Sequence, residues 1–521
     1  MVSRVEDIAG WAASLTLEDI PADVVARGRD QRRSVLGSVA ASSRDGAAKR
    51  VLSAVEGWAR DGPVTLAGTE RNVAVEDAIY GAAALSMALD FDDYVCFGHT
   101  GHSGVLVPMM LAAETGSSAA EQLVAQTIAN EVEARLGGAC LVGPLNGQLW
   151  SFIHMAGAAL AAGRLLGLGA EQMANALAIA LYQAPRATVP GFMAPDSKLL
   201  TAAEPAVAGV RAARLAAAGV TGALDALEHD EGFLAAFADA PLPGMLGGLG
   251  EGWATRTLCV KPYPGCAYLD TTVDALLELG PPAAGDVRRV VVEASLLTYE
   301  MNRMSGPYAS VSSGEVPTPV TINFSVPWNV AVTLVAGELT PTEVSDDWLN
   351  AHADELRSVA QRVELEHDWS LTRLTTEAFA GLIPFGRVAG EGGLRRMGAS
   401  MRRRRGGAGA GAGQLGGLHH MFWPLPDLTT MRSRRPFWDA ASVDAFAMTF
   451  PARVRVTGID GVERVAECAR PRGGAGNPLE GPEPVSRAKL AAYGPWLWGD
   501  DGTEAIAKAI DADDDNLWRH L

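Results

Sequence analysis

The first half of the chain has a pattern of apolar residues that closely packed α-helices satisfy. From Ile8 to about Gly247, apolar positions recur at helical spacing. The most apolar part, Phe152 to Ala184, is rich in Ala and Gly but is interrupted by Arg164, Glu171 and Gln172. We therefore expect buried helices of a globular protein here and not a membrane span.

The pattern changes near Trp253. Arg288 to Ala294 predicts a strand, and Arg453 to Val456 with Val462 to Ala469 predicts a hairpin that turns at Asp460-Gly461. We predict a mainly α fold with an α+β part, in which a large all-helical domain carries a smaller α+β lid domain. The predicted boundaries are residues 1–255 plus 473–521 for the helical domain and 256–472 for the lid.

A segment inside the predicted lid, residues 391–435, has the composition of an insertion. Arg402 to Arg405 precede a run of Gly and Ala, which cannot bury much apolar surface. We expect this insertion to be flexible.

Charge and cysteine usage limit the partners and the compartment. The net charge of -18 disfavours nucleic acids and anionic membranes as partners. Five cysteines without a CxxC spacing favour a reducing compartment over a disulfide framework, and the segment that follows Met1 has no apolar signal core. We expect a cytoplasmic protein. Only five of the 43 basic residues are lysines, so each lysine is a candidate for a specific role.

The richest cluster of chemical groups lies between Asp90 and His102. These thirteen residues contain three carboxylates and two imidazoles, in a chain with nine histidines. The cluster lies between two apolar helical runs, Val75 to Leu89 and Val105 to Ala113, so a rigid platform is expected to carry it. Carboxylates and imidazoles are the usual acid–base groups near neutral pH. The alternative is a solvated loop with a helix-capping Asp, but Phe91 and its aromatic neighbours favour burial.

Two further segments contain candidate residues. Lys198 lies near a predicted helix start, where a cation is unfavourable unless an anion is close; the alternative is an ordinary surface lysine. The segment Val260 to Asp270 contains two prolines and a glycine at the predicted domain junction, a common place for ligand sites. The alternative there is a rigid linker. We find no GxGxxG, GxSxG, P-loop or HExxH pattern, so no cofactor or metal is expected.

Taken in order, these segments resemble the MmgE/PrpD family, which includes 2-methylcitrate dehydratase and cis-aconitate decarboxylase. The residues that carry the resemblance are Ala88 to Asp93, Val107-Pro108, Asn130 to Val132, Lys198, Gly209 to Ala213, Lys261 to Pro264 with Cys266, Asn323 to Ser325 and Asp460-Gly461. The resemblance implies an all-helical domain, an α+β lid, an active site between them, a homodimer and cofactor-free lyase chemistry on di- or tricarboxylates.

Several residues match the positions of family active-site residues, and others depart from them. The matching positions are Asp90, Tyr94, His102, Lys198 and Lys261. Tyr94 replaces a family threonine, Asp270 stands where the family has a histidine, and Gly143 to Gly147 lacks the usual His-Pro. The loss of two imidazoles points to a non-standard substrate.

Elimination beside a carboxylate needs a base, a cation for the enolate-like charge and an acid. We therefore expect His102 to be the acid/base group, oriented and charged by Asp90. Lys198 and Lys261 would hold carboxylate or enolate oxygens, and Asp270 would act as a base or repel an anionic substrate. The predicted catalytic set is Asp90, His102, Lys198 and Asp270, and the predicted substrate-binding set is Asp93, Tyr94, His99, Lys261 and Tyr268.

The function predicted from these residues is a lyase that dehydrates or decarboxylates a small molecule beside a carboxylate or carbonyl. Three alternatives stay open. The first is a diverged isomerase, epimerase or cyclase of specialised metabolism. The second is a metal-dependent hydrolase that uses Asp90, Asp92, His99 and His102. The third is a binding protein without catalytic activity.

Overall fold

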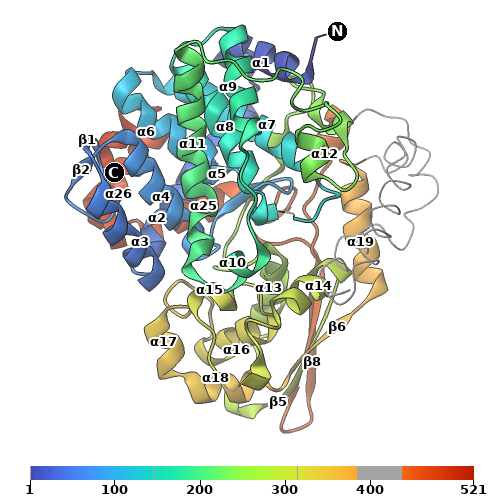
Figure 1. Cartoon of the computed structure of the whole chain (residues 1–521). Helices are drawn as coiled ribbons and strands as arrows, with labels where there is room; N and C mark the ends of the chain where they lie inside the picture. The colour runs from blue at the N-terminus through green and yellow to red at the C-terminus, as the bar shows by residue number, and fades with distance from the viewer. Residues whose placement is uncertain (1, 146, 314, 384–436) are drawn as a thin grey trace.

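Long helices pack side by side through the amino-terminal half of the chain (Figure 1). The structure, a computed structural model, describes residues 2–145, 147–313, 315–383 and 437–521. The helices of this half are α1 (Arg4–Ser14), α2 (Ala22–Ser42), α3 (Gly46–Trp58), α4 (Val75–Ala88), α5 (Gly101–Gly104), α6 (Leu106–Thr115), α7 (Ala119–Ala139), α8 (Ser151–Leu165), α9 (Ala170–Tyr182), α10 (Val189–Met193), α11 (Leu200–Ala217) and α12 (Phe233–Phe237). A small hairpin of β1 (Asp61–Thr65) and β2 (Asn72–Val73) lies beside them.

The bundle is held by close helix contacts that small residues permit. α8 contacts α7, α9 and α11. A Cβ on Gly209 of α11 would collide with the backbone of Met155 and Ala159 of α8, so glycine is required at this crossing. The Ala- and Gly-rich sequence of α8 and α9 therefore produces close-packed helices, as predicted.

A four-stranded sheet forms the lower part of the molecule in Figure 1. Its strand order is β6-β5-β7-β8, with β5 parallel to β6 and antiparallel to β7. The strands are β5 (Val287–Ala294), β6 (Val363–His367), β7 (Ala452–Gly458) and β8 (Glu463–Cys468). The strand and the hairpin predicted from the sequence are confirmed.

Helices surround this sheet and complete the α+β part of the fold. α13 contacts β7 and β8, and α16 contacts β6 and α18. The helices of this part are α13 (Asp270–Glu278), α14 (Leu296–Ser305), α15 (Pro319–Ile322), α16 (Val326–Ala336), α17 (Asp346–Ala351), α18 (Ala353–Ala360), α19 (Trp369–Ala380) and α24 (Ala440–Asp444).

The carboxyl-terminal helices return to the helical part. α25 (Pro482–Tyr493) packs along α2, and α26 (Pro495–Asp511) contacts both α2 and α25. We call α1–α12 with α25 and α26 the helical body, and the sheet with α13–α18 the sheet region. The predicted fold class, a large helical part plus a smaller α+β part, is confirmed. The domain boundaries stay predictions, and the insertion predicted at 391–435 lies outside the described residues.

A pair of short strands lies between the helical body and the sheet region. β3 (Asp93–Val95) pairs antiparallel with β4 (Leu258–Val260). Asp93 lies opposite Val260, so the acidic loop after α4 comes next to Lys261, the residue after β4. This pairing brings together two segments that are far apart in the sequence.

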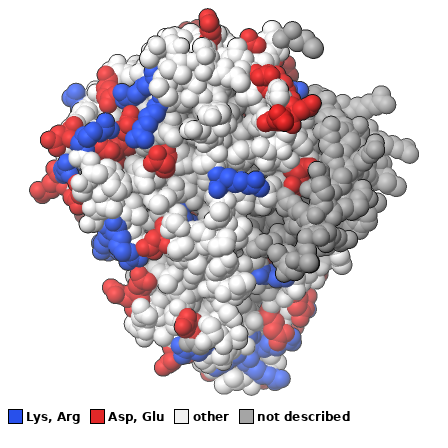
Figure 2. Space-filling model, in the orientation of Figure 1, with Lys and Arg blue, Asp and Glu red and all other residues white. Residues whose placement is uncertain are grey.

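The surface and the cysteines add two observations. On the face drawn in Figure 2, acidic and basic side chains lie interspersed around a wide uncharged area. All five cysteines are free thiols, and four of them are buried. None of the helices in the described ranges is both long and apolar enough to cross a membrane.

Candidate active site

Asp90 occupies a strained position directly after α4. Its φ of 54° lies in the left-handed region, which a residue other than glycine adopts at a cost in energy. Lys261 Nζ donates to the Asp90 carbonyl at 2.9 Å and to Asp90 Oδ1 at 3.0 Å. The buried ammonium group therefore stabilises both the turn and its carboxylate.

Oxygens of Asp90 and Asp92 surround the ammonium group of Lys261. Besides the two bonds to Asp90, its Nζ lies 2.5 Å from Asp92 Oδ1. An ammonium group has three donor hydrogens, and three acceptors surround this one. Burial alone would lower the pKa of Lys261, but the carboxylates of Asp90 and Asp92 outweigh it and raise the pKa above its usual value.

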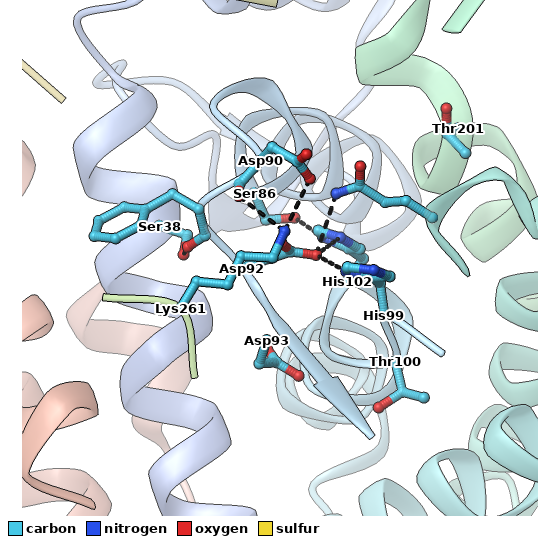
Figure 3. Close-up of polar contacts among 12 residues, drawn as sticks. Ser38, Ser86, Asp90, Asp92, Asp93, His99, Thr100, His102, Thr201 and Lys261 are labelled. Carbon is cyan, nitrogen blue, oxygen red and sulfur yellow. Dashed lines mark hydrogen bonds and ion pairs between the residues drawn. The ribbon is translucent and has the colours of Figure 1, made fainter. Parts of the chain in front are cut away.

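Asp92 is the centre of the cluster, where Lys261, His99 and His102 converge (Figure 3). Its Oδ2 lies 2.6 Å from His99 Nδ1 and 2.9 Å from His102 Nε2. Burial raises the pKa of Asp92, but His99, Lys261 and His102 together bring it well below its usual value. Because an ionised carboxylate only accepts hydrogen bonds, both ring nitrogens that face Asp92 carry hydrogens.

Of the two histidines that contact Asp92, His99 is the one that lines the pocket. Its Nδ1 donates to Asp92, which leaves Nε2 as the acceptor of the neutral ring. A Cβ built on Gly147, another pocket residue, would lie 3.9 Å from His99 Nε2. Burial lowers the pKa of His99, and Asp92 opposes this only in part. Near neutral pH, His99 therefore presents a lone pair on Nε2 at the pocket wall.

His102 lies behind Asp92, with 1% of its surface exposed. Its Nε2 contacts Asp92 and its Nδ1 lies 2.7 Å from Ser86 Oγ, so neither nitrogen is free. His102 does not line the pocket. The acid/base role predicted for His102 stays a prediction, and the geometry favours His99 for direct contact with a substrate.

Lys198 lies in a 3-10 turn, Asp196–Leu199, is fully buried and does not line the pocket. Its Nζ is 3.9 Å from Asp90 Oδ2 and donates to the side-chain oxygen of Asn323 at 2.6 Å. Burial lowers the pKa of Lys198, with Asp90 opposing the shift. The sequence analysis expected an anion near Lys198, because a cation near a helix start is unfavourable. The carboxylate of Asp90 is that anion.

Of the four remaining predicted residues, two line the pocket and two do not. Tyr94 and Tyr268 line the pocket, and burial raises the pKa of both, so both keep their phenolic hydrogens. Asp93 lies apart from the cluster in Figure 3 and accepts from Gln31 Nε2 at 2.8 Å. Asp270 begins α13, is 2% exposed and does not line the pocket. Burial raises the pKa of Asp270 well above its usual value, and a neutral carboxyl does not repel an anion.

The pocket beside His99 is narrow and mostly apolar. Its free volume is about 50 Å³. The polar lining comes from Asp90, His99, Gln148 and Lys261 with the two tyrosines. The apolar wall includes Phe97 and Phe192 from the helical body, Met301, Met304 and Phe324 from the sheet region, and Phe450 beside β7.

Two residues of the site were missed by the sequence analysis. Gln148 donates to Asp92 Oδ2 at 3.3 Å and lines the pocket, although nothing in its local sequence marks it. Lys489 on α25 donates to the Phe91 carbonyl at 2.9 Å and supports the acidic loop from behind. The scarcity of lysine was the one signal that could have found Lys489.

The metal-dependent alternative required Asp90, Asp92, His99 and His102 as ligands. In the described part of the chain, no three or more His, Cys, Asp or Glu side chains form a group that could hold a metal ion. The imidazole nitrogens that face Asp92 are occupied by hydrogen bonds to its carboxylate. These side chains form a hydrogen-bonded acid–base cluster.

Comparison with known proteins gives two family matches and several distant relatives. The MmgE/PrpD N-terminal domain matches residues 6–244, and the MmgE/PrpD C-terminal domain matches residues 263–387. A cis-aconitate decarboxylase of Aspergillus terreus (strain NIH 2624 / FGSC A1156) is 24% identical over 69% of this chain and 78% of its own length. A second one, from Aspergillus terreus, is 26% identical over 52% of this chain and 59% of its own length. The cis-aconitate decarboxylase-like protein oryM of Aspergillus oryzae (strain ATCC 42149 / RIB 40) is 25% identical over 34% of this chain and 39% of its own length.

Proposed function

The chain belongs to the MmgE/PrpD family, and we propose that it is a lyase in which His99 moves a proton at a carbon beside a carboxylate or carbonyl. The distant relatives support a dehydratase- or decarboxylase-like lyase at the level of reaction class. The observation that carries the proposal is the hydrogen bond from His99 Nδ1 to Asp92, which leaves Nε2 at the wall of the pocket.

For a dehydration, the neutral imidazole is the form that starts the reaction. His99 Nε2 takes the proton from the carbon beside the carboxylate, and the electron pair of that C–H bond forms the carbon–carbon double bond. Hydroxide leaves the neighbouring carbon and takes the proton back from His99, so that water is released and the imidazole is neutral again. The lowered pKa of His99 favours this form near neutral pH.

For a decarboxylation, the same residue would act as an acid. The bond to the departing carboxylate breaks, its electron pair stays on the remaining carbon, and His99 in its protonated form delivers a proton to the product. Asp92 would stabilise that imidazolium across 2.6 Å. Because burial disfavours the charged ring, dehydration fits His99 better than decarboxylation.

Lys198 would stabilise the negative charge that develops on the substrate oxygens. Lys198 is fully buried and does not line the pocket, so its charge would act through Asp90, which does line the pocket and whose Oδ2 lies 3.9 Å from Lys198 Nζ. Cofactor independence and a homodimeric assembly are further parts of the proposal, and both come from the family resemblance.

An isomerase or cyclase of the same family would use the same proton transfer without losing water or carbon dioxide. The test therefore measures both the proton transfer and the loss of water or carbon dioxide. We would incubate the protein in D2O with hydroxycarboxylates and unsaturated acids that have one, two or three carboxyl groups. Mass spectrometry would follow deuterium uptake and the loss of water or carbon dioxide.

We expect His99→Gln to abolish both signals, while the exposed control His229→Gln keeps them. Products with the same elemental composition as the substrate, apart from deuterium, would favour the isomerase alternative. If His99→Gln retains turnover within a factor of about ten of wild type, the proposed role of His99 is wrong.

A further inference from the structure

We infer that the substrate carries hydroxyl groups on two neighbouring carbons, the carbon that gives up its proton and the one next to it. The inference rests on the proposed function, because it assigns a substrate class to the same site. It follows from two hydrogen-bond acceptors, Asp90 and Gln148, which line the pocket together with His99 and keep unused capacity within the described part of the chain.

Gln148 presents an acceptor because its amide group has only one favourable orientation. Its Nε2 donates to Asp92 Oδ2 at 3.3 Å, and an ionised carboxylate can accept a hydrogen bond but cannot donate one. The other amide atom, Oε1, is buried and has no hydrogen-bond partner among the described residues. A buried acceptor without a partner is unfavourable, so a ligand hydroxyl that donates to Oε1 removes this cost.

Asp90 presents the second acceptor. Lys261 Nζ donates to Asp90 Oδ1 at 3.0 Å, which leaves Oδ2 for other partners. This oxygen accepts no hydrogen bond from the described residues, and its ion pair with Lys198 spans 3.9 Å, which is beyond hydrogen-bond distance. The chain places this carboxylate at the pocket although the backbone of Asp90 is strained, a combination that is typical of functional sites.

Both acceptors belong to the cluster that orients the base. Lys261 joins Asp90 to Asp92 (Figure 3). Asp92 Oδ2 in turn accepts from His99 and from Gln148. The base and the two acceptors therefore line one narrow pocket as parts of a single hydrogen-bonded cluster. Hydroxyl groups on the reacting carbon and on its neighbour are the groups that suit both acceptors.

The two hydroxyl groups differ in the acceptor that suits them. The one next to the carboxyl or carbonyl group is the more acidic, so it donates to the carboxylate of Asp90, and the departing one donates to Gln148. His99 takes the proton from carbon 2 and returns it to the hydroxide that leaves carbon 3, so water is released. The remaining hydroxyl is then an enol, which transfers its hydrogen to carbon 3 and becomes a 2-oxo product without any oxidant.

Calorimetry in the His99→Gln variant, which we expect not to turn the ligands over, measures the preference for each hydroxyl. The ligands are butanoate, 2-hydroxybutanoate, 3-hydroxybutanoate and 2,3-dihydroxybutanoate, as separate stereoisomers, and their primary amides, which carry an uncharged carbonyl. We expect the best dihydroxy stereoisomer to bind about thirtyfold or more tightly than its parent compound, since each hydroxyl contributes roughly three- to tenfold or more. 2-Amino-3-hydroxybutanoate should bind more weakly than the diol, because Lys261 and Lys198 already lie near Asp90.

Asp90→Asn in the same background separates the two hydroxyl groups. Asparagine tolerates the left-handed backbone, and its amide oxygen can keep the hydrogen bond from Lys261, so a donor replaces the acceptor Oδ2. The variant should lose the contribution of the 2-hydroxyl and keep that of the 3-hydroxyl, while the exposed control Asp225→Asn changes neither.

Three results would overturn the inference: no preference for the hydroxylated ligands, no binding of any dihydroxy ligand at millimolar concentration, or tighter binding of the amino compound than of the diol. Since these measurements need no turnover, such a result leaves the proton-transfer proposal standing. Turnover by His99→Gln would instead contradict the proton-transfer proposal.

Discussion

His99 Nδ1 lies 2.6 Å from Asp92 Oδ2, and this contact determines which nitrogen of His99 is available for chemistry. The carboxylate holds the hydrogen on Nδ1, so the lone pair is on Nε2 at the pocket wall. Lys261 holds Asp92 in turn, through an ion pair with its other oxygen. The lysine therefore acts on the reaction through Asp92 and His99.

Asp92→Asn should reduce turnover by about two to four orders of magnitude while the protein stays folded. An amide in place of the carboxylate no longer stabilises the hydrogen on His99 Nδ1 or the imidazolium that forms during proton transfer. Steady-state kinetics on the substrate found by the D2O screen would measure the effect. The exposed Asp225→Asn is the matched control, and a kcat for Asp92→Asn close to wild type would contradict the role of Asp92.

Gln148→Leu should weaken the binding of hydroxylated ligands selectively. Gln148 Oε1 is buried and has no hydrogen-bond partner among the described residues, so it can accept from a hydroxyl group of a substrate. A hydrogen bond of this kind contributes about 0.5 to 1.5 kcal/mol, or roughly three- to tenfold in affinity. Calorimetry in the His99→Gln background, which we expect not to turn the ligand over, would compare a 3-hydroxy acid from the D2O screen with its deoxy analogue. Equal losses for both ligands would show that Gln148 only shapes the pocket.

Asp93→Asn should stabilise the protein at neutral pH and change the pH dependence of its stability. Burial raises the pKa of Asp93 to about 6, because the charged carboxylate is disfavoured inside the protein. Since the folded pKa is above the unfolded one, the wild-type protein loses stability as pH rises from about 4 to about 6. The full difference is about 3 kcal/mol, which urea unfolding at pH 4.5 and 7 would measure. If both proteins show the same slope, Asp93 does not titrate in this window.

Lys489→Met should remove a pH dependence of opposite sign in a higher window. Burial lowers the pKa of Lys489 to about 7, against the attraction of Asp92 and Asp93. Between about pH 7 and pH 10 the unfolded chain holds a proton that the folded one has released, so wild-type stability rises with pH by up to about 1.4 kcal/mol per unit.

Lys489 also donates to Ser34 Oγ at 3.2 Å and lies 4.0 Å from the centre of the Phe91 ring. Its loss should therefore loosen the acidic loop and lower kcat along with stability. The exposed Lys508→Met is the control for both measurements. A variant that keeps the wild-type pH slope would show that Lys489 is not the titrating group.

The periodicity of the sequence determined most of the fold, because helices and hairpins depend on neighbouring residues. The apolar repeat of the first half and the alternation around Asp460-Gly461 both predicted the elements that form. β6, Val363–His367, was missed because its short sequence alternates with charged residues and resembles a surface segment. The strand is formed by its parallel pairing with β5, a contact that crosses about seventy residues of chain.

Residue types also determined where the site lies, but only the tertiary structure decided what each residue does. His99 and His102 are three residues apart and share one oxygen of Asp92, yet burial leaves only His99 beside the pocket. The β3–β4 pairing places Lys261 on Asp90, 171 residues away, and α25 brings in Lys489. Access to solvent, the partner of a charge and the loss of its hydration all arise from packing between distant segments, and local sequence does not contain them.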